Sequence, residues 1–371
     1  MPDTATTAAG GTWLRGVLAE HYGLPHATEI ERFAEGTETD NFTVLVHPTG
    51  ERYFAKVRRP GYSHDYQARM LALERQARLS TRARLPAPKT LADGQGRLLV
   101  PVGGRAVSVQ DFVSDAHTSR TVWTSDEAAE VGSVLGQFHR WLAGRPTTDS
   151  GGVPVPELWW TKPPSTSIAR ARQAVDAIRV LQRDGRATDA DAVRLDQLRT
   201  RVKDIERHHG RLAEGLPPVV RQLVHGDFTR SNLLMRGHRV AAVLDPRIRV
   251  LPAAWELGRI AFDPLTVAES DTDAWLATAV AMVTAYRDAN PRLVPEQVAA
   301  CARMALLHAL LSTYGVYEHY LDPDPVDQTG VDLYWDRRAR MVVSLLEHLD
   351  TVEGELAAAA QASPRRTWSN P

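Results

Sequence analysis

The sequence contains a single cysteine, and its apolar runs are expected to be too short to cross a membrane. Cys301 alone cannot form an intrachain disulfide or a zinc site made of several thiolates. The most apolar stretches, 275–286 and 298–311, are shorter than the roughly 20 residues of a transmembrane helix. The first residues carry neither the basic region nor the apolar region of a secretory signal. We therefore expect a cytoplasmic protein with no membrane partner.

An excess of charge of one sign is also missing. The 371 residues carry a formal net charge of −1, and 43% of them are apolar while 24% are charged. This balance lacks the basic excess that displaces counterions from nucleic acid, so no nucleic-acid partner is expected. The apolar fraction is too high for a globally disordered chain. At about 100–200 residues per domain, the length predicts two domains or one two-lobed unit.

Lysine is scarce, since only four of the 44 basic residues are lysines. Arginine supplies nearly every ordinary positive charge in this chain. One of the four lysines, Lys56, lies in the apolar segment 53–57. A compact ammonium differs from a planar guanidinium in reach and geometry, so a lysine at this place indicates a requirement that arginine does not meet.

The N-terminal part, residues 1–113, is predicted to form a nucleotide-binding lobe built on a small sheet. An amphipathic helix comes first, and its apolar face is formed by Trp13, Leu14, Val17 and Leu18. Alternating apolar residues and short turns then predict five strands, with one helix inserted after the third. The clearest of these segments are the strands 42–47, 52–58, 98–102 and 106–113 and the helix 66–79.

The remainder, residues 114–362, is predicted to be a mainly helical catalytic and substrate lobe. Thr124 to Glu127 form a capping box, which is typical of a helix start. Two helices with charged outer faces form an insert near 165–210. Helices dominate again from Trp255 onward. The last residues, 363–371, have no apolar anchors and are expected to fray.

Three oxygen-bearing side chains are expected to converge in this second lobe. Asp227 and Asn232 lie at the two ends of a loop, with four residues between them. A short hairpin follows, and its second strand, 240–244, leads directly to Asp245. The hairpin therefore returns Asp245 to the loop. Such a group suits phosphoryl transfer, in which one carboxylate orients the attacking hydroxyl while a second carboxylate and an amide oxygen hold Mg²⁺.

The segment from His225 to Asn232 resembles the catalytic loop of the aminoglycoside phosphotransferase and choline kinase-like family. In that family His-Gly-Asp is followed by four residues and then Asn. Asp245 and the segments 135–139 and 255–258 also resemble stretches of the family. The resemblance implies an α+β, bilobal protein kinase-like fold. Its first lobe would be a small five-stranded antiparallel sheet with one helix, and its second lobe would be large and mainly helical.

The same resemblance implies a role for each residue of the loop region. Asp227 would be the catalytic base, and Asn232 and Asp245 would be Mg²⁺ ligands. ATP or GTP would be the co-substrate. His225 is expected to be structural, because a loop histidine holds backbone groups through hydrogen bonds.

In the first lobe the resemblance implies a nucleotide site. Lys56, on the third strand, would contact the nucleotide phosphates and pair with Glu74, the only acidic residue within the next helix. A polar turn ending at Asn41 takes the place of the nucleotide-covering loop, although this turn is poor in glycine. Gln110 and Phe112 belong to a segment that resembles the hinge between the lobes, where the purine would bind.

The phosphate acceptor is the least defined part of this interpretation. Acidic and aromatic residues are mixed in the segment 314–336, which suits a cationic or sugar-bearing alcohol and equally suits a solvated loop beside core aromatics. The sequence thus predicts a small-molecule kinase. Its substrate would be an antibiotic such as an aminoglycoside, with a metabolite alcohol such as choline or homoserine as the alternative.

Two other interpretations are less favoured. A protein kinase would need an activation segment, but only residues 246–252 separate Asp245 from the region around Trp255. An inactive kinase-fold binding protein would not need the full set of polar groups that is present. The chain is expected to act as a monomer or a homodimer.

Overall fold

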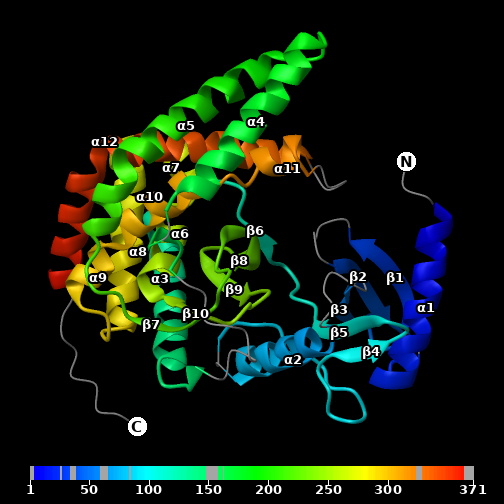
Figure 1. The fold of residues 1–371 in the computed structure, drawn as a ribbon. Helices are drawn as coiled ribbons and strands as arrows, with labels where there is room; N and C mark the ends of the chain where they lie inside the picture. Colours follow the sequence, from blue (N-terminus) through cyan, green and yellow to red (C-terminus); the bar gives the residue numbers. More distant parts are fainter. Residues whose placement is uncertain are drawn as a thin grey trace.

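The computed structural model has two lobes, drawn side by side in Figure 1. It describes residues 4–25, 27–33, 39–58, 66–82, 85–147, 158–161, 163–322 and 328–362. Most of the polar turn before Asn41, part of the acidic segment at 323–327 and the predicted frayed tail therefore lie outside the described residues.

The first lobe is a fully antiparallel sheet of five strands in the order β1-β2-β3-β5-β4. The strands are β1 (Ala27–Phe33), β2 (Thr39–Val46), β3 (Glu51–Arg58), β4 (Val100–Val102) and β5 (Arg105–Asp111). Helix α2 (Tyr66–Arg82) follows β3. The predicted five strands with a helix after the third are thereby confirmed.

The two faces of this sheet differ in polarity because side chains alternate along each strand. One face is apolar and includes Ala55 and Val57, which pack in one cluster with Leu14 and Leu18 of helix α1 (Thr4–Tyr22). This confirms the predicted first helix and its apolar face. Asn41, Lys56 and Ser108 lie directly opposite one another on β2, β3 and β5, so they share the other face. The sheet thus carries a buried row of polar side chains on the face that α1 does not cover.

The second lobe is mainly helical and also contains short strands. Its helices are α3 (Ser125–Leu142), α4 (Ser165–Arg183), α5 (Asp189–Glu214), α6 (Ala253–Ala261), α7 (Pro264–Ala268), α8 (Thr272–Ala289), α9 (Pro295–Ala299), α10 (Cys301–Leu311), α11 (Val316–Tyr320) and α12 (Gln328–Ala362). Its strands are β6 (His117–Thr118), β7 (Arg221–Val224), β8 (Leu233–Arg236), β9 (Arg239–Val243) and β10 (Arg249–Pro252). Short 3₁₀ turns lie at Trp159–Thr161 and Arg230–Asn232.

Helix α3 begins at the predicted capping box and packs closely on α8. Thr124 is the N-cap, and its side chain and that of Glu127 exchange hydrogen bonds with each other's backbone N–H. A Cβ atom at Gly136 would lie 2.7 Å from the carbonyl oxygen of Tyr286, so only glycine permits this approach of the two helices. The close packing fixes the position of the next residues of α3, which reach the functional site.

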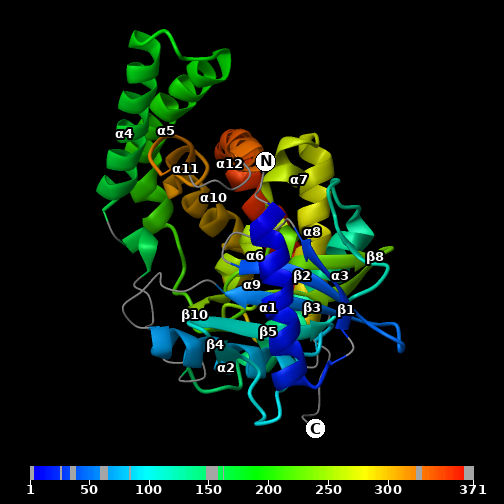
Figure 2. The ribbon, with the colours of Figure 1, turned by 90° about the vertical axis from the view of Figure 1, so that its right-hand side faces the viewer.

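The insert predicted near 165–210 is a long hairpin of α4 and α5. Figures 1 and 2 show its far end projecting away from the other elements. Ile178 and Leu198 of the hairpin belong to one apolar cluster with Val316 of α11 and Trp335 of α12. The hairpin is therefore attached to the last helices of the second lobe.

One segment, Pro295–Tyr320, is long and apolar enough to satisfy the composition of a membrane span. In the structure this segment comprises α9, α10 and α11, and 72% of its most apolar window is buried within the protein. This burial is what the central helix of a folded lobe requires.

Candidate active site

The loop after β7 is held by the buried imidazole of His225. Its Nε2 lies 2.9 Å from the carbonyl oxygen of Leu244, and its Nδ1 lies 3.2 Å from the backbone nitrogen of Asp227. A carbonyl only accepts and an amide N–H only donates, so Nε2 carries the proton and Nδ1 accepts. Burial lowers the pKa of His225, which keeps this neutral form. The predicted structural role of His225 agrees with these bonds, which join the Asp227 loop to the end of β9.

A fully buried carboxylate, Glu256 of α6, fixes the same loop from the other side. Its oxygens accept hydrogen bonds from the backbone N–H groups of His225 (2.9 Å), Gly226 (2.6 Å) and Phe228 (3.4 Å). His139 Nε2 of α3 donates a fourth bond at 2.9 Å. Burial acts to raise the pKa of Glu256, but the bonds and charges of its partners outweigh burial and lower it. The loop is therefore anchored on a charged group inside the protein.

This anchor is the end of a longer chain of hydrogen bonds. Asn290 Nδ2 donates to the hydroxyl of Tyr286 at 3.1 Å. That hydroxyl lies 2.9 Å from Nδ1 of His139, which accepts because its Nε2 proton is given to Glu256. His139, Tyr286 and Glu256 are all completely buried. This chain of hydrogen bonds thus links α8, α3 and α6 to the backbone of the loop.

Asp227 lies at the surface of this loop and contacts three polar side chains. Asn232 Nδ2 donates to its backbone oxygen at 2.9 Å and to its Oδ2 at 3.2 Å. Arg259 lies 3.1 Å from Oδ1, and Arg247 lies 3.6 Å from Oδ2. The carboxylate remains 24% exposed. The group is oriented on both oxygens and is still accessible to a small hydroxyl compound.

Asp245 is brought back to the loop by the β8–β9 hairpin, as the sequence predicts. The backbone N–H of Leu244 donates to the carbonyl of Asn232 at 2.8 Å, which places the two ends of the hairpin together. Asp245 has a φ of +53°, in the left-handed region that aspartate tolerates better than most residues. Its carboxylate is 46% exposed and forms an ion pair with Lys56 of the first lobe.

The ion pair between Lys56 and Asp245 joins the two lobes at the site. Burial acts to raise the pKa of Asp245, but the charge and hydrogen bond of Lys56, with a further contribution from Arg58, lower it. Lys56 lies on the polar face of the sheet, directly opposite the buried Asn41 of β2. The ion pair therefore brings Lys56 and its strand neighbour Asn41 to the end of the hairpin, whose other end carries Asn232 and its bonds to Asp227.

The predicted pairing of Lys56 with Glu74 is wrong in this structure. Glu74 Oε1 instead accepts from Arg78 at 2.9 Å, one turn further along α2. The residue of α2 that reaches the second lobe is Gln76, whose Nε2 donates to the carbonyl of Arg247 at 3.0 Å. Residues two apart on a helix are about 200° apart around its axis. Glu74 consequently points away from the side that Gln76 directs toward the site.

The predicted hinge residues lie at the end of β5. Gln110 Nε2 donates to Thr90 Oγ1 at 3.4 Å. The backbone N–H of Phe112 donates to the carbonyl of Arg52 at 3.1 Å, and the Arg52 guanidinium lies 4.0 Å from the centre of the Phe112 ring. The N–H and the ring of Phe112 are thus both in contact with Arg52 of β3.

Arg230, one of the four residues between Asp227 and Asn232, is buried and joins the loop to other parts of the second lobe. Its guanidinium bonds to Asp263 at 3.0 Å, to the carbonyl of Thr121 at 2.8 Å and to Thr266 Oγ1 at 2.8 Å. It also lies 3.8 Å from the ring centre of Trp123. The arginine of the loop is therefore fully engaged by the protein, and the cations near Asp227 come from other elements.

Sequence reasoning missed these cations, Arg247 and Arg259. Arg259 lies three residues after the acidic residue of α6 and on the same side of the helix. A helical plot of 253–261 would have placed the arginine near Glu256. Its contact with Asp227 depends on how α6 packs under the loop, which the sequence pattern does not give.

Two acidic groups of the segment 314–336, Glu318 and Asp332, are used within the protein. Asp332 pairs with Arg194 of α5 at 2.9 Å and with His319 at 2.7 Å. Glu318 accepts from the backbone N–H of Gly315 at 2.6 Å. These two carboxylates attach α11 and α12 to their neighbours.

A partly buried histidine beside the site predicts a pH dependence of stability. His308 of α10 packs edge to face on Trp255 at 5.6 Å between ring centres. Burial, with the charges of Arg259 and Arg338, holds the pKa of His308 well below its usual value. The unfolded chain binds this proton below about pH 6.5 and the folded protein does not, so stability rises with pH in this range by up to about 1.4 kcal/mol per unit.

We therefore expect His308→Phe to lose less stability than the parent protein when the pH falls from 7.5 to 5.5. The measurement is the thermal unfolding midpoint across this range. His238→Gln, at the exposed β8–β9 turn, is the control and should keep the slope of the parent. Equal slopes for His308→Phe and the parent would contradict the assignment.

Comparisons with known proteins bear on the family and the fold of the chain. Residues 29–292 match the family model described as "Phosphotransferase enzyme family". No curated protein sequence matches the chain. The fold does match many solved structures, and three of them are representative.

Amicoumacin kinase in complex with AMP-PNP, Ca²⁺ and its ligand superimposes with a TM-score of 0.59 at 12% identity, covering 92% of this chain and 96% of the other. Spectinomycin phosphotransferase with ADP and spectinomycin gives 0.55 at 13% identity, covering 95% and 98%. A choline/ethanolamine kinase family protein from Mesorhizobium loti gives 0.56 at 18% identity, covering 94% and 98%. These matches confirm the predicted kinase-like fold over nearly the whole chain.

Proposed function

The chain belongs to the phosphotransferase enzyme family, and we propose that it transfers the γ-phosphate of ATP to a hydroxyl group of a small molecule. The observation that carries this proposal is the connected group of Lys56, Asp245, Asn232 and Asp227, which spans both lobes. It supplies one cation from the sheet and oxygen donors from the loop. Phosphoryl transfer depends chiefly on such positioning and charge stabilisation.

In this proposal Asp227 accepts or orients the proton of the acceptor hydroxyl. Its two oxygens are already directed by Asn232 and Arg259, and the carboxylate is partly open to solvent. Lys56 contacts the phosphates of the nucleotide, and its pairing with Asp245 keeps the ammonium on the side of the loop. The base and the nucleotide cation thus approach the reacting phosphate from different lobes.

A divalent cation fits the donor set beside Lys56. Among the described residues no cluster of three His, Cys, Asp or Glu side chains forms a metal site. Mg²⁺ usually takes only one or two protein ligands together with phosphate oxygens and water. The exposed carboxylate of Asp245 and the amide oxygen of Asn232, whose nitrogen faces Asp227, would hold it. When bound it would neutralise charge on the phosphates.

The acceptor is proposed from the family and from the neighbouring structures. Two neighbours are kinases or phosphotransferases of antibiotics, and one belongs to a choline/ethanolamine kinase family. An antibiotic or another sugar-bearing natural product is therefore one candidate class, and a metabolite alcohol such as choline or homoserine is the other. GTP is an alternative donor, because no described contact distinguishes the two purines.

The proposal is tested by incubating the purified protein with Mg²⁺ and ATP or GTP and a panel of antibiotics and metabolite alcohols, with product masses read directly. We expect one acceptor class to gain a single phosphate. Lys56→Ala should lower kcat/KM for the nucleotide roughly ten- to hundredfold, the scale of a lost charged hydrogen bond. Lys203→Ala, an exposed lysine on α5 outside the site, is the matched control. Unchanged nucleotide affinity and turnover in Lys56→Ala would remove Lys56 from the proposal.

A further inference from the structure

The side of Asp227 that faces the second lobe is lined by hydrogen-bond donors. Trp255 and Arg259 lie one turn apart on α6, and the Arg259 guanidinium is 5.4 Å from the Trp255 ring centre. Trp255 Nε1 and Arg259 Nε are both buried, and neither has a hydrogen-bond partner among the described residues. Both groups only donate. A buried donor without a partner is unfavourable, and a bound acceptor group would remove that cost.

Two more buried guanidiniums lie behind this surface. Arg338 of α12, 3% exposed, donates to Ser312 Oγ at 2.7 Å and to the carbonyl of Tyr314 at 3.2 Å. Arg201 of α5, also 3% exposed, donates to the carbonyl of Ala309 at 2.7 Å. Within the part of the chain that the structure describes, neither forms an ion pair with a carboxylate. Burial and the nearby charge of Arg338 lower the pKa of Arg201 to about 9.

Aromatic rings accompany these donors. His308 packs edge to face on Trp255 at 5.6 Å between ring centres, and the Arg338 guanidinium lies 5.8 Å from the ring centre of Tyr314. Tyr314, whose carbonyl accepts from Arg338, is 43% exposed, and burial with a smaller contribution from the charge of Asp227 raises its pKa. The surface next to the proposed base therefore combines positive charge with an accessible aromatic ring.

One terminal nitrogen of Arg259 pairs with Asp227 at 3.1 Å, and two nearby carboxylates of the segment 314–336 are engaged elsewhere. Asp332 forms ion pairs with Arg194 and His319, and Glu318 accepts a hydrogen bond from the backbone of the turn before α11. A polycationic acceptor would meet repulsion at this surface, whereas an anionic one would find partners for its oxygens. Carboxylate geometry suits a guanidinium in particular.

We propose that the acceptor carries a carboxylate close to its reactive hydroxyl, and that Arg259 with Trp255 recognises it. The substrate class is then a hydroxy acid or a hydroxyl compound with an acid group, rather than a polycation. This inference rests on the proposed phosphotransferase function and selects among its acceptors.

The test compares acceptors that differ in one group. One set is glycerate, glyceramide and 3-amino-1,2-propanediol, and a larger set is gluconate, gluconamide and glucamine. We expect kcat/KM with Mg²⁺ and ATP to be at least roughly tenfold higher for the carboxylate member, the scale of one charge-assisted contact. Calorimetry of the same compounds with protein saturated with Mg²⁺ and AMP-PNP should rank their affinities in the same order.

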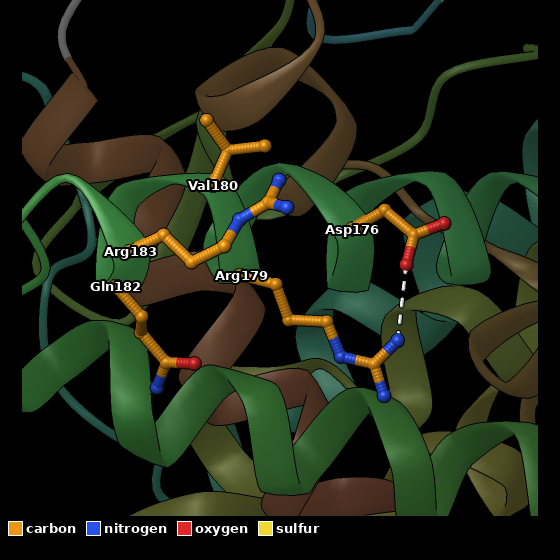
Figure 3. A pocket seen from close by; sticks show the side chains of 5 residues that line it. All are labelled: Asp176, Arg179, Val180, Gln182 and Arg183. Atoms are coloured by element: carbon orange, nitrogen blue, oxygen red, sulfur yellow. Dashed lines mark hydrogen bonds and ion pairs between the residues drawn. The ribbon is translucent and has the colours of Figure 1, made fainter.

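Variants then assign the preference to residues. Arg259→Gln and Trp255→Phe should reduce the ratio of carboxylate to carboxamide kcat/KM toward one. The control is Arg179→Gln, which removes a guanidinium that pairs with Asp176 at 3.1 Å. Figure 3 shows this pair in a surface hollow lined only by residues of α4. Arg179→Gln should keep the ratio of the parent protein.

The outcomes separate this inference from the function on which it rests. A preference for the amine member, no preference in either measurement, or an unchanged ratio in Arg259→Gln would overturn the carboxylate assignment. Transfer of phosphate to aminoglycosides or choline in those cases would leave the phosphotransferase function intact. A protein that neither binds the nucleotide nor transfers phosphate to any acceptor would instead overturn the function.

Discussion

Asp227→Asn is expected to lower turnover by roughly 10²–10⁴, the usual contribution of a general base, while nucleotide affinity stays close to that of the parent protein. The amide keeps the size of the carboxylate and can still bond to Asn232, so the loop should keep its shape. It loses the charge that faces Arg259 at 3.1 Å and the ability to accept a proton. The measurements are single-turnover phosphate transfer and calorimetric binding of Mg²⁺ and AMP-PNP.

A matched control separates lost chemistry from a general effect of the substitution. Asp271 is the exposed N-cap of α8, where its side chain accepts from the backbone N–H of Ala274 at 2.8 Å. Asparagine caps helices about as well as aspartate, so Asp271→Asn should leave turnover and stability near those of the parent. Turnover at the parent level in Asp227→Asn would remove this residue from the mechanism.

The arrangement of the loop could be predicted because its constraints are local. A stretch of four residues, a short hairpin and a strand that leads to Asp245 leave few ways for Asp227, Asn232 and Asp245 to separate. The hydrogen bonds from Leu244 to Asn232 and from Asn232 to Asp227 are what such a hairpin produces. The five-stranded sheet was similarly accessible, since alternation along β2, β3 and β5 distinguishes its apolar face from its polar one.

What could not be predicted depends on how helices pack. The rotation of α2 decides whether Glu74 or Gln76 faces the second lobe, and both residues are compatible with the same helical pattern. Arg259 was missed for the same reason, because it reaches Asp227 only after α6 packs under the loop. The resemblance of 255–258 to the family marked an acidic helix start. It did not indicate that Glu256 would bind three backbone N–H groups of the loop.

That anchoring role makes Glu256→Gln the second substitution with a large expected effect. The carboxylate accepts from three backbone N–H groups and from His139 in a fully buried position. A glutamine has only one accepting oxygen, so its NH₂ group would face N–H donors of the loop. Removing one partner of a buried charged network costs roughly 3–5 kcal/mol. We expect a marked fall of the thermal unfolding midpoint.

Catalysis should fall together with stability, because the anchored backbone carries Asp227. A displacement of about 1 Å in a reacting group is enough to cost roughly 10²-fold in rate. Measuring kcat well below the unfolding midpoint of the variant separates this effect from simple unfolding. Glu206→Gln, which removes an exposed ion pair with Arg172 at 3.1 Å, is the control and should change neither quantity appreciably. If Glu256→Gln were as stable and active as Glu206→Gln, the loop would be held by its own hairpin and His225 alone, and the buried carboxylate would be dispensable.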